Sequence, residues 1–349
     1  MIKCSNCGGA ARARQLFTLL FLAGAASIPL ACFIGPLALE PGQIRLFLAD
    51  FFGFSVEIPT GDAAFKNGVI VTQIRLARVC LSFGAGAGLA LAGVAFQGIL
   101  RNPLADPFTL GVSGGAALGA SLGISFGVGV LLLPFWALGG ASLALASVLL
   151  LAARGGLKRE SLILAGVVVS AFLAALIALV KALDEDSVSS IVFWIMGSFQ
   201  NRGWQHFEIF WPFFLFGGLL LLLLHRELDL LNLGETQARL LGLEAGKVRL
   251  AILLAASCLS AACVAVSGIV GFVGIIVPHL VRLVQGPRHF WLLINSALAG
   301  GLLLLWADTL ARVALPSGLE LPVGVITALL GGPCFCLILS RKSRLFVAD

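Results

Sequence analysis

The uncharged stretch at residues 79–100, VCLSFGAGAGLALAGVAFQGIL, decides the fold class. It is about as long as the roughly 20 apolar residues that an α-helix needs to cross the hydrocarbon core of a bilayer. Comparable runs recur along most of the chain, so the sequence predicts an all-α integral membrane protein. A membrane β-barrel needs short segments of alternating polarity, and these continuous Leu, Ala, Gly and Val runs exclude it.

The overall composition leads to the same class. The chain has 349 residues, of which 59% are hydrophobic and only 11% are charged, and its mean hydropathy is +1.05. Soluble globular domains are nearer one half apolar, with about a quarter of their residues charged. A soluble fold is therefore excluded.

The apolar runs predict ten transmembrane spans, with both termini cytoplasmic. If the termini lie inside, 16 of the 23 Lys and Arg residues fall on the cytoplasmic side and 7 remain outside, as the positive-inside rule requires. The net charge of +6 is then a signal of topology, and no nucleic-acid partner is expected. The two spans around Gly268 could also be one broken helix. The predicted spans are 16–37, 76–99, 108–126, 128–152, 161–182, 207–225, 250–267, 269–285, 290–312 and 322–340.

These spans divide the chain into one ten-helix permease domain, residues 16–340, between two short cytoplasmic tails, 1–15 and 341–349. An external loop at 38–75 contains PGQIRLFLADFFG, whose apolar spacing is typical of a helix. A polar cytoplasmic segment occupies residues 226–249. The pair Cys4 and Cys7 lies in the first tail without a second pair, so a zinc site is not indicated and its role stays open.

Enzyme chemistry has little support in the sequence. The stretch GLEAGK at 242–247 lacks the glycine and the hydroxyl of a phosphate-binding loop, because those positions hold Leu241 and Val248. No paired-histidine metal motif or nucleophile elbow occurs, so we expect no catalytic residue, no cofactor and no metal site. The remaining six cysteines lie in or beside apolar runs and are expected to be buried thiols.

A few polar residues within or beside the spans are candidates for a transport pathway or gate. Asp308 lies deep in a span, four residues before Arg312, so the two can pair on one helical face. Gln97, Asn102 and Asp106 surround a hard turn at the inner mouth, although turn chemistry alone could explain the Asn-Pro and Asp-Pro pairs. Charges inside the spans are scarce, which argues against an ion-coupled secondary transporter and for an external source of energy.

The third span repeats glycine at every fourth position. Such a ridge lets another helix approach closely, and we expect tight packing there rather than contact with a substrate. The glycines are Gly111, Gly115, Gly119, Gly123 and Gly127.

Four stretches of the chain resemble the FecCD family, the permeases of type II ABC importers for ferric siderophores, haem and cobalamin. They are residues 75–120, residues 238–249 (ARLLGLEAGKVR), residues 267–289 (SGIVGFVGIIVPHLVRLVQGPRH) and residues 307–333. The resemblance implies ten helices in each protomer of a homodimer or pseudo-dimer. It also implies two cytoplasmic ATPase subunits, an external substrate-binding protein and a place in the inner membrane.

The resemblance also implies roles for particular residues. The polar segment is similar to the family's coupling helices, which contact the ATPase; its matching residues are Gly234, Glu235, Arg239, Leu241, Gly242, Glu244 and Arg249. Ala238 and Leu241, with Leu240 and Leu243, would form an apolar patch for that partner, and Gly242 would allow a bend between two short helices. An amphipathic helix on the inner leaflet is the alternative.

On the outer side, Arg75, Arg78 and Arg312 match family arginines that meet acidic residues of the binding protein. Ala77 replaces the proline that usually separates the first two. The function that these features imply is import of an iron chelate such as a ferric siderophore, powered by a separate ATPase. Cobalamin or haem is the alternative cargo. An ion-coupled secondary transporter and a membrane scaffold that transports nothing are the alternative classes.

Overall fold

The computed structural model describes residues 5–56, 61–153, 155, 157–315 and 319–346, and this part of the chain is helical without a strand. The helices are α1 (Ser5–Phe33), α2 (Pro41–Phe51), α3 (Asp62–Val69), α4 (Ala77–Leu100), α5 (Val112–Ser125), α6 (Leu133–Ala153), α7 (Arg159–Leu183), α8 (Val188–Ile195), α9 (Trp204–Leu223), α10 (His225–Leu233), α11 (Glu235–Leu240), α12 (Ala245–Ser267), α13 (Val273–Gln285), α14 (His289–Val313) and α15 (Val323–Phe346).

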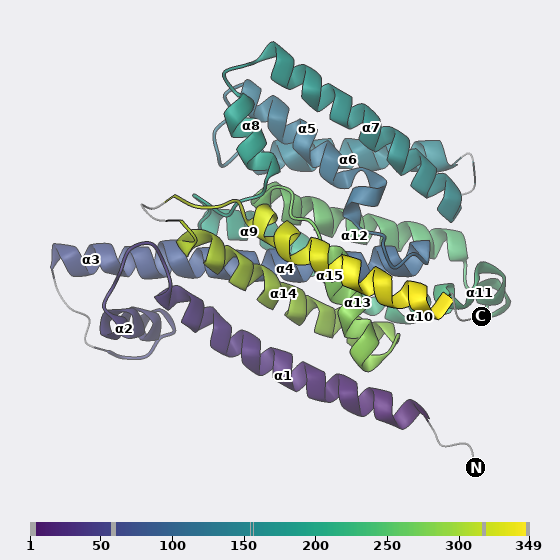
Figure 1. Cartoon of the computed structure of the whole chain (residues 1–349), viewed down its shortest axis with the longest axis horizontal. Coiled ribbons are helices and arrows are strands. Elements are labelled where there is room, and N and C mark those ends of the chain that lie inside the picture. Colours follow the sequence, from purple (N-terminus) through teal and green to yellow (C-terminus); the bar gives the residue numbers. More distant parts are fainter. Residues whose placement is uncertain (1–4, 57–60, 154, 156, 316–318, 347–349) are drawn as a thin grey trace.

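The ten predicted spans are confirmed as ten apolar helices. Seven helical stretches are long and apolar enough to cross a bilayer, and α5, α13 and the first part of α15 are shorter apolar helices. The chain around Gly268 forms two helices, because residues 268–272 interrupt it between α12 and α13. In Figure 1 the first turns of α1 and the last turns of α15 lie at the same end of the bundle as α11. This arrangement agrees with an even number of spans.

Helix α4 stands at the centre of the bundle. Nearly all of its residues are buried, and α9, α12, α13 and α14 pack around it. A Cβ placed on Gly86 would lie 2.3 Å from the carbonyl oxygen of Gly300 on α14, and one on Gly93 would lie 2.0 Å from that of Gly274 on α13. Both distances are far inside van der Waals contact, so only glycine permits these two crossings.

The predicted glycine ridge has two different roles. Gly115 and Gly119 of α5 lie against the backbone of α6, where added Cβ atoms would come within 2.4 Å of Gly140 and 2.1 Å of Trp136. Gly111 and Gly127 lie outside α5 with positive φ, at the positions where the helix begins and ends. Close packing is therefore confirmed, but it joins α5 to a helix at the edge of the bundle.

The tails and the outer loop contain more helix than the sequence indicated. Residues 5–15 belong to α1, whose Ala13 is buried and accepts a hydrogen bond from Asn295 of α14 at 3.0 Å. In the outer loop the helix predicted from its apolar spacing is α2, but residues 62–75 are already helical. They run through α3 and a π-helical turn (Ile70–Leu76) directly into α4. Residues 341–346 likewise continue α15.

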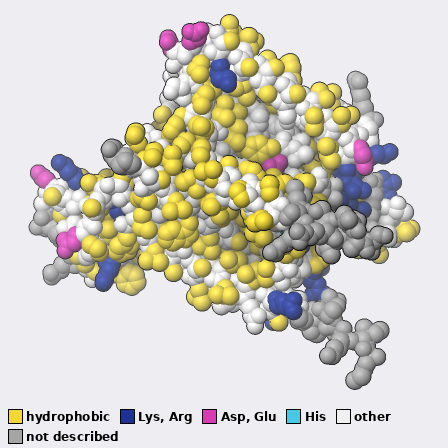
Figure 2. Space-filling model, viewed as in Figure 1, with side chains coloured by type: hydrophobic (Ala, Val, Ile, Leu, Met, Phe, Trp, Pro, Cys, Tyr) yellow, Lys and Arg dark blue, Asp and Glu magenta, His cyan; other side chains and the backbone are white. Residues whose placement is uncertain are grey.

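Apolar side chains cover most of the visible surface, and charges gather at its ends. Figure 2 shows the Lys and Arg side chains grouped mainly at the end that carries α11 in Figure 1. An apolar surface with charges at both ends is expected of a protein surrounded by lipid. Four of the six cysteines in apolar runs are partly or wholly exposed, so only Cys32 and Cys263 are buried thiols as predicted. Cys4 and the side chain of Cys7 lie outside the described residues.

The close crossing of α4 and α14 gives a direct test of the packing. Gly86→Ala should lower the free energy of unfolding by about 1–3 kcal/mol, since the new methyl group forces the two helices apart. Gly139→Ala is the matched control, because nothing lies within 4 Å of a Cβ at this glycine of α6. Thermal unfolding in detergent would measure both, and an equal melting temperature for the two variants would contradict the role given to Gly86.

Candidate functional site

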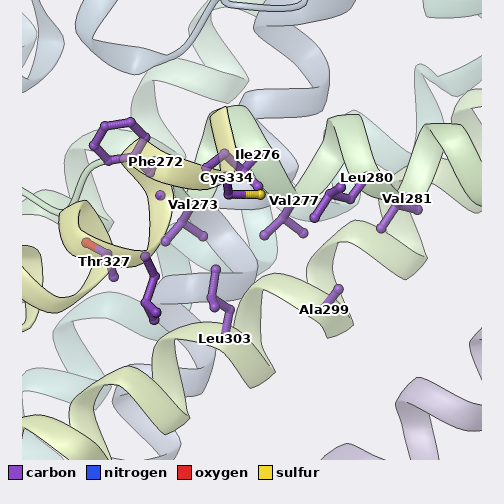
Figure 3. Close-up of a pocket in the computed structure, with 12 residues that line it drawn as sticks. Phe272, Val273, Ile276, Val277, Leu280, Val281, Ala299, Leu303, Thr327 and Cys334 are labelled. Carbon is purple, nitrogen blue, oxygen red and sulfur yellow. The ribbon is translucent and has the colours of Figure 1, made fainter. Parts of the chain in front are cut away.

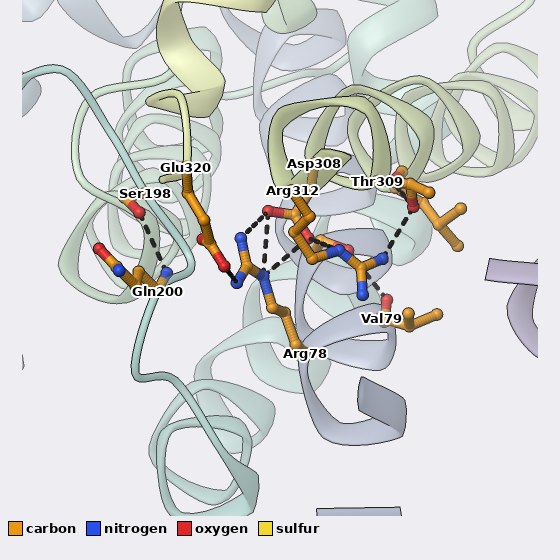
Figure 4. A network of polar contacts seen from close by, with 10 residues as sticks. Arg78, Val79, Ser198, Gln200, Asp308, Thr309, Arg312 and Glu320 are labelled. Carbon is orange, nitrogen blue, oxygen red and sulfur yellow. Dashed lines mark hydrogen bonds and ion pairs between the residues drawn. The ribbon is translucent and has the colours of Figure 1, made fainter. Parts of the chain in front are cut away.

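A buried network of charged side chains joins the outer ends of α4 and α14 (Figure 4). The guanidinium group of Arg78 donates to Asp308 at 2.8 and 3.0 Å and to Glu320, just before α15, at 3.0 Å. Arg312 lies 3.5 Å from Asp308 and donates to the Thr309 hydroxyl at 2.9 Å. The predicted pairing of Asp308 with Arg312 is thus confirmed, and Arg78 is a second partner of the same carboxylate.

The network contains equal numbers of positive and negative groups. Asp308 is fully buried, and Arg78 and Arg312 are only 6% and 3% exposed. Buried charges are tolerated only when they are paired and their hydrogen bonds are made. Two arginines and two carboxylates pair with one another here, so each side chain depends on the others, although Arg312 Nε and Glu320 Oε2 make no hydrogen bond.

The third arginine predicted at the outer surface is also buried. Arg75 is 4% exposed and donates to the backbone oxygens of Cys32, at 3.0 Å, and Leu37. A Cβ on Gly35 would lie 2.8 Å from its guanidinium carbon, so that glycine leaves the space it occupies. All three arginines therefore have internal partners. Docking of a binding protein stays a prediction for Arg75, Arg78 and Arg312, and their burial does not favour it.

At the opposite end, the polar segment forms two short helices followed by a turn. Gly234 separates α10 from α11 and Gly242 separates α11 from α12, both with positive φ. The bend between the short helices α10 and α11 therefore lies at Gly234. Gly242 provides a second bend, between α11 and α12. A Cβ on Gly234 would lie 3.5 Å from a guanidinium nitrogen of Arg101.

The residues matched to the coupling helices differ in exposure. Leu240 and Leu241 are 82% and 62% exposed, whereas Ala238 is fully buried, so the apolar patch consists of the two leucines. Arg239 and Glu244 are exposed, and Glu244 pairs with Lys247. The side chain of Glu235 lies outside the described residues.

Arg249 does not belong to this exposed surface. It is 5% exposed and donates to the backbone oxygen of Leu157 at 3.0 Å, in the connection between α6 and α7. A role of Arg249 in contact with an ATPase stays a prediction, and the burial of its side chain does not favour it.

Helix α10 is attached to α4 and α14 by side chains that the sequence did not indicate. Arg101, at the end of α4, donates to the backbone oxygen of Leu231 at 3.1 Å. Asp229 accepts from the ring Nδ1 of His289 at 2.6 Å and from the backbone N–H of the same residue at 3.1 Å. Partial burial raises the pKa of Asp229, but the hydrogen bonds from His289 outweigh it and keep that pKa below its ordinary value.

The candidate pathway residues other than Asp308 make structural contacts. Gln97 is 2% exposed and donates to the backbone oxygens of Gly274 and Ile275. Asn102 accepts from the backbone of Leu104, and Asp106 caps the short helical turn at 107–110. Burial raises the pKa of Asp106 to about 6, although its hydrogen bonds act in the opposite direction. Turn and cap chemistry accounts for these residues, and a pathway role stays a prediction.

An apolar cavity of about 380 Å³ lies between α13, α14 and α15 (Figure 3). Its walls are aliphatic apart from Phe272, Thr327 and Cys334, and the Thr327 hydroxyl donates to the backbone oxygen of Gly324. No wall residue carries a charge, so the cavity has no group that would hold an anionic chelate. It is space between helices.

The ten apolar helices of the described residues, with an exposed polar segment at one end, are the architecture of a polytopic membrane protein, and its sequence lacks a nucleotide-binding loop. Comparison with known protein families identifies the family: the chain belongs to the FecCD transport family, whose model matches residues 19–341. It is a permease subunit of an ABC importer.

Similar proteins match nearly the whole chain. An uncharacterized ABC transporter permease protein, YvrB of Bacillus subtilis, is 42% identical, with 87% of each chain covered. The Fe(3+) dicitrate transport system permease protein FecD of Escherichia coli is 37% identical over 93% of this chain and 98% of its own. A solved structure described as an inward-facing conformation of a putative metal-chelate type ABC transporter is 32% identical, with a TM-score of 0.80 over 94% of this chain and 99% of that one.

The shared carboxylate of the outer network gives a further test. Asp308→Asn should reduce the free energy of unfolding by about 3–5 kcal/mol, because two buried guanidinium groups lose the negative charge that they share. Asp186→Asn is the control, since Asp186 is an exposed carboxylate at the outer end, and it should change stability by no more than about 0.5 kcal/mol. Unfolding in detergent checks both, and a melting temperature of Asp308→Asn within error of the wild type would refute the network.

Proposed function

We propose that this permease moves an iron chelate across the inner membrane. The observation that carries the proposal is the set of similar proteins named for such cargo: iron-citrate permeases of Bacillus subtilis and Escherichia coli and the Fe(3+)-hydroxamate permease FhuG of Bacillus subtilis. The hemin permease HmuU of Yersinia pestis and a cobalamin permease of Halobacterium salinarum keep those cargoes as alternatives. A molybdate permease of Haemophilus influenzae adds an oxyanion to the range.

The proposal includes an ATPase on a separate chain, docked on the polar segment. The support is the exposed pair Leu240 and Leu241 beside Arg239, at the end of the molecule where cationic side chains gather. The open groove between α11 and the start of α7 extends this surface, and it is lined by Lys158, Arg159 and Glu160 together with Arg239 and Leu240. An apolar contact with a charged rim is typical of a protein interface.

The proposal also includes a second permease and an external binding protein. A homodimer, or a pseudo-dimer with a related permease, would cover part of the exposed apolar face of α7, where Leu164, Val168 and Phe172 are more than half exposed. If the binding protein docks through Arg78, an acidic side chain of the binding protein must replace Glu320 as the partner of Arg78. The exchange is chemically matched, since both are carboxylates.

The cargo can be tested by uptake into proteoliposomes that hold the permease with its ATPase and binding protein. We expect ATP-dependent uptake of radioactive ferric citrate or a ferric hydroxamate, competed by the unlabelled chelate but not by hemin, cobalamin or molybdate. Uptake of one of those three in place of the ferric chelates would reject the iron assignment while preserving the transport class.

The ATPase contact can be tested by reversing one charge. Arg239→Glu should reduce cargo-stimulated ATP hydrolysis about tenfold or more, or prevent the ATPase from co-purifying, because a central charge of an interface is worth about 1–2 kcal/mol or more. Lys66→Glu makes the same charge change on an exposed side chain of α3, at the other end of the molecule, and should leave both measurements unchanged. Normal stimulated hydrolysis in Arg239→Glu would argue against this surface.

A further inference from the structure

Helix α10 of the polar segment is bonded to both members of the closely packed pair α4 and α14. The bond from Arg101 to Leu231 attaches it to α4, and the paired contacts between Asp229 and His289 attach it to α14. Helix α11, by contrast, packs mainly on its chain neighbours α10 and α12. A displacement of the polar segment can therefore reach the centre of the bundle through α10.

His289 is built into this junction on two sides. Its side chain is 1% exposed, and a Cβ on Gly98 of α4 would lie 3.1 Å from its Nε2, so glycine at position 98 leaves space for the ring. Nδ1 faces the Asp229 carboxylate at 2.6 Å and carries the proton, since an ionised carboxylate only accepts. Nε2 is then free to accept from the Asn232 amide at 3.3 Å, and both ring nitrogens contact α10.

Asp229 also takes the place of a local cap for α14. The residue before the helix, Arg288, provides no side-chain hydrogen bond to the first turn. The backbone N–H of His289 is satisfied instead by Asp229, sixty positions earlier in the sequence. A carboxylate at a helix N-terminus is favoured by the helix dipole as well as by the hydrogen bond. The start of α14 is thus held by a side chain of another helix.

The far end of α14 carries Asp308, which binds Arg78 of α4. Between the two ends, α14 is in direct backbone contact with α4 at Gly86 and Gly300, where no side chain can rearrange. Polar contacts therefore fix the two helices to each other at the outer end and to α10 at the inner end.

We propose that Asp229 and His289 are positioning residues that transmit movement of the polar segment to the α4–α14 pair. This inference rests on the proposed function, since the movement comes from an ATPase docked on that segment. Helix α10 moves with the docked ATPase, and the start of α14 follows through the two hydrogen bonds from His289 to Asp229. Removing these bonds disconnects ATP hydrolysis from transport without touching the ATPase surface or the cargo.

The test measures uptake and ATP hydrolysis together in proteoliposomes that hold the complete importer, with ferric citrate as the probe. Asp229→Ala should lower the cargo moved per ATP about tenfold, because α14 loses both charge-assisted hydrogen bonds to α10, while ATP hydrolysis stays within about twofold of the wild type. Asp229→Asn keeps an oxygen acceptor and should restore most of the ratio. Asp186→Ala makes the same substitution at an exposed carboxylate outside the polar segment, and as the control it should leave the ratio unchanged.

His289→Phe provides a second variant in case Asp229→Ala does not assemble. Phenylalanine keeps the ring in the buried space while removing both nitrogens, and Asp229, whose side chain is 43% exposed, stays hydrated. A smaller fall in cargo per ATP is expected than in Asp229→Ala, because the backbone N–H of residue 289 still donates to Asp229. If the wild type transports normally and His289→Phe moves as much cargo per ATP as the wild type, the inference is overturned. A wild-type complex without ATP-dependent uptake of any offered cargo overturns the proposed function itself.

Discussion

The close approach of α4 to its neighbours is the constraint on which the rest of the bundle depends. Lipid is as apolar as a leucine side chain, so burial from water cannot draw transmembrane helices together, and dense packing must do so instead. Gly86 and Gly93 allow the backbone of α4 to lie directly on that of α14 and α13. Any side chain at these positions would separate the helices and remove the contacts that replace the hydrophobic effect.

The buried outer network follows from this packing. Because α4 and α14 lie so close, Arg78 and Asp308 face each other across the contact and form two short hydrogen bonds. In a medium of low dielectric an unmatched charge would be very costly, so Asp308 pairs with both arginines and Glu320 is a second carboxylate partner of Arg78. The glycine contact therefore determines which charges can be buried, and the buried charges in turn hold the helices in register.

The sequence predicted those features that depend on short separations along the chain. Apolar runs gave the spans, and a separation of four residues gave the Asp308–Arg312 pair. The partners of Arg78 lie 230 and 242 positions away, and no local pattern indicates which helices will meet. The burial of Arg75 and Arg249 was missed for the same reason, because an arginine beside a span can turn outward or donate to a distant carbonyl. The junction of Asp229 and His289, sixty positions apart, was missed for the same reason.

The distribution of packing determines where a conformational change can occur. Sliding α14 along α4 would drive backbone atoms into each other at Gly86 and Gly300 and would break the ion pairs at Arg78. A neighbouring face of α14, with Ala299 and Leu303, borders the apolar cavity shared with α13 and α15, where aliphatic side chains surround open space. Such side chains can change rotamer at small cost, and no polar bond must break when the cavity closes. A displacement that enters α14 from α10 is therefore opposed by the backbone contact and the ion pairs with α4, whereas on the cavity side it meets only aliphatic side chains.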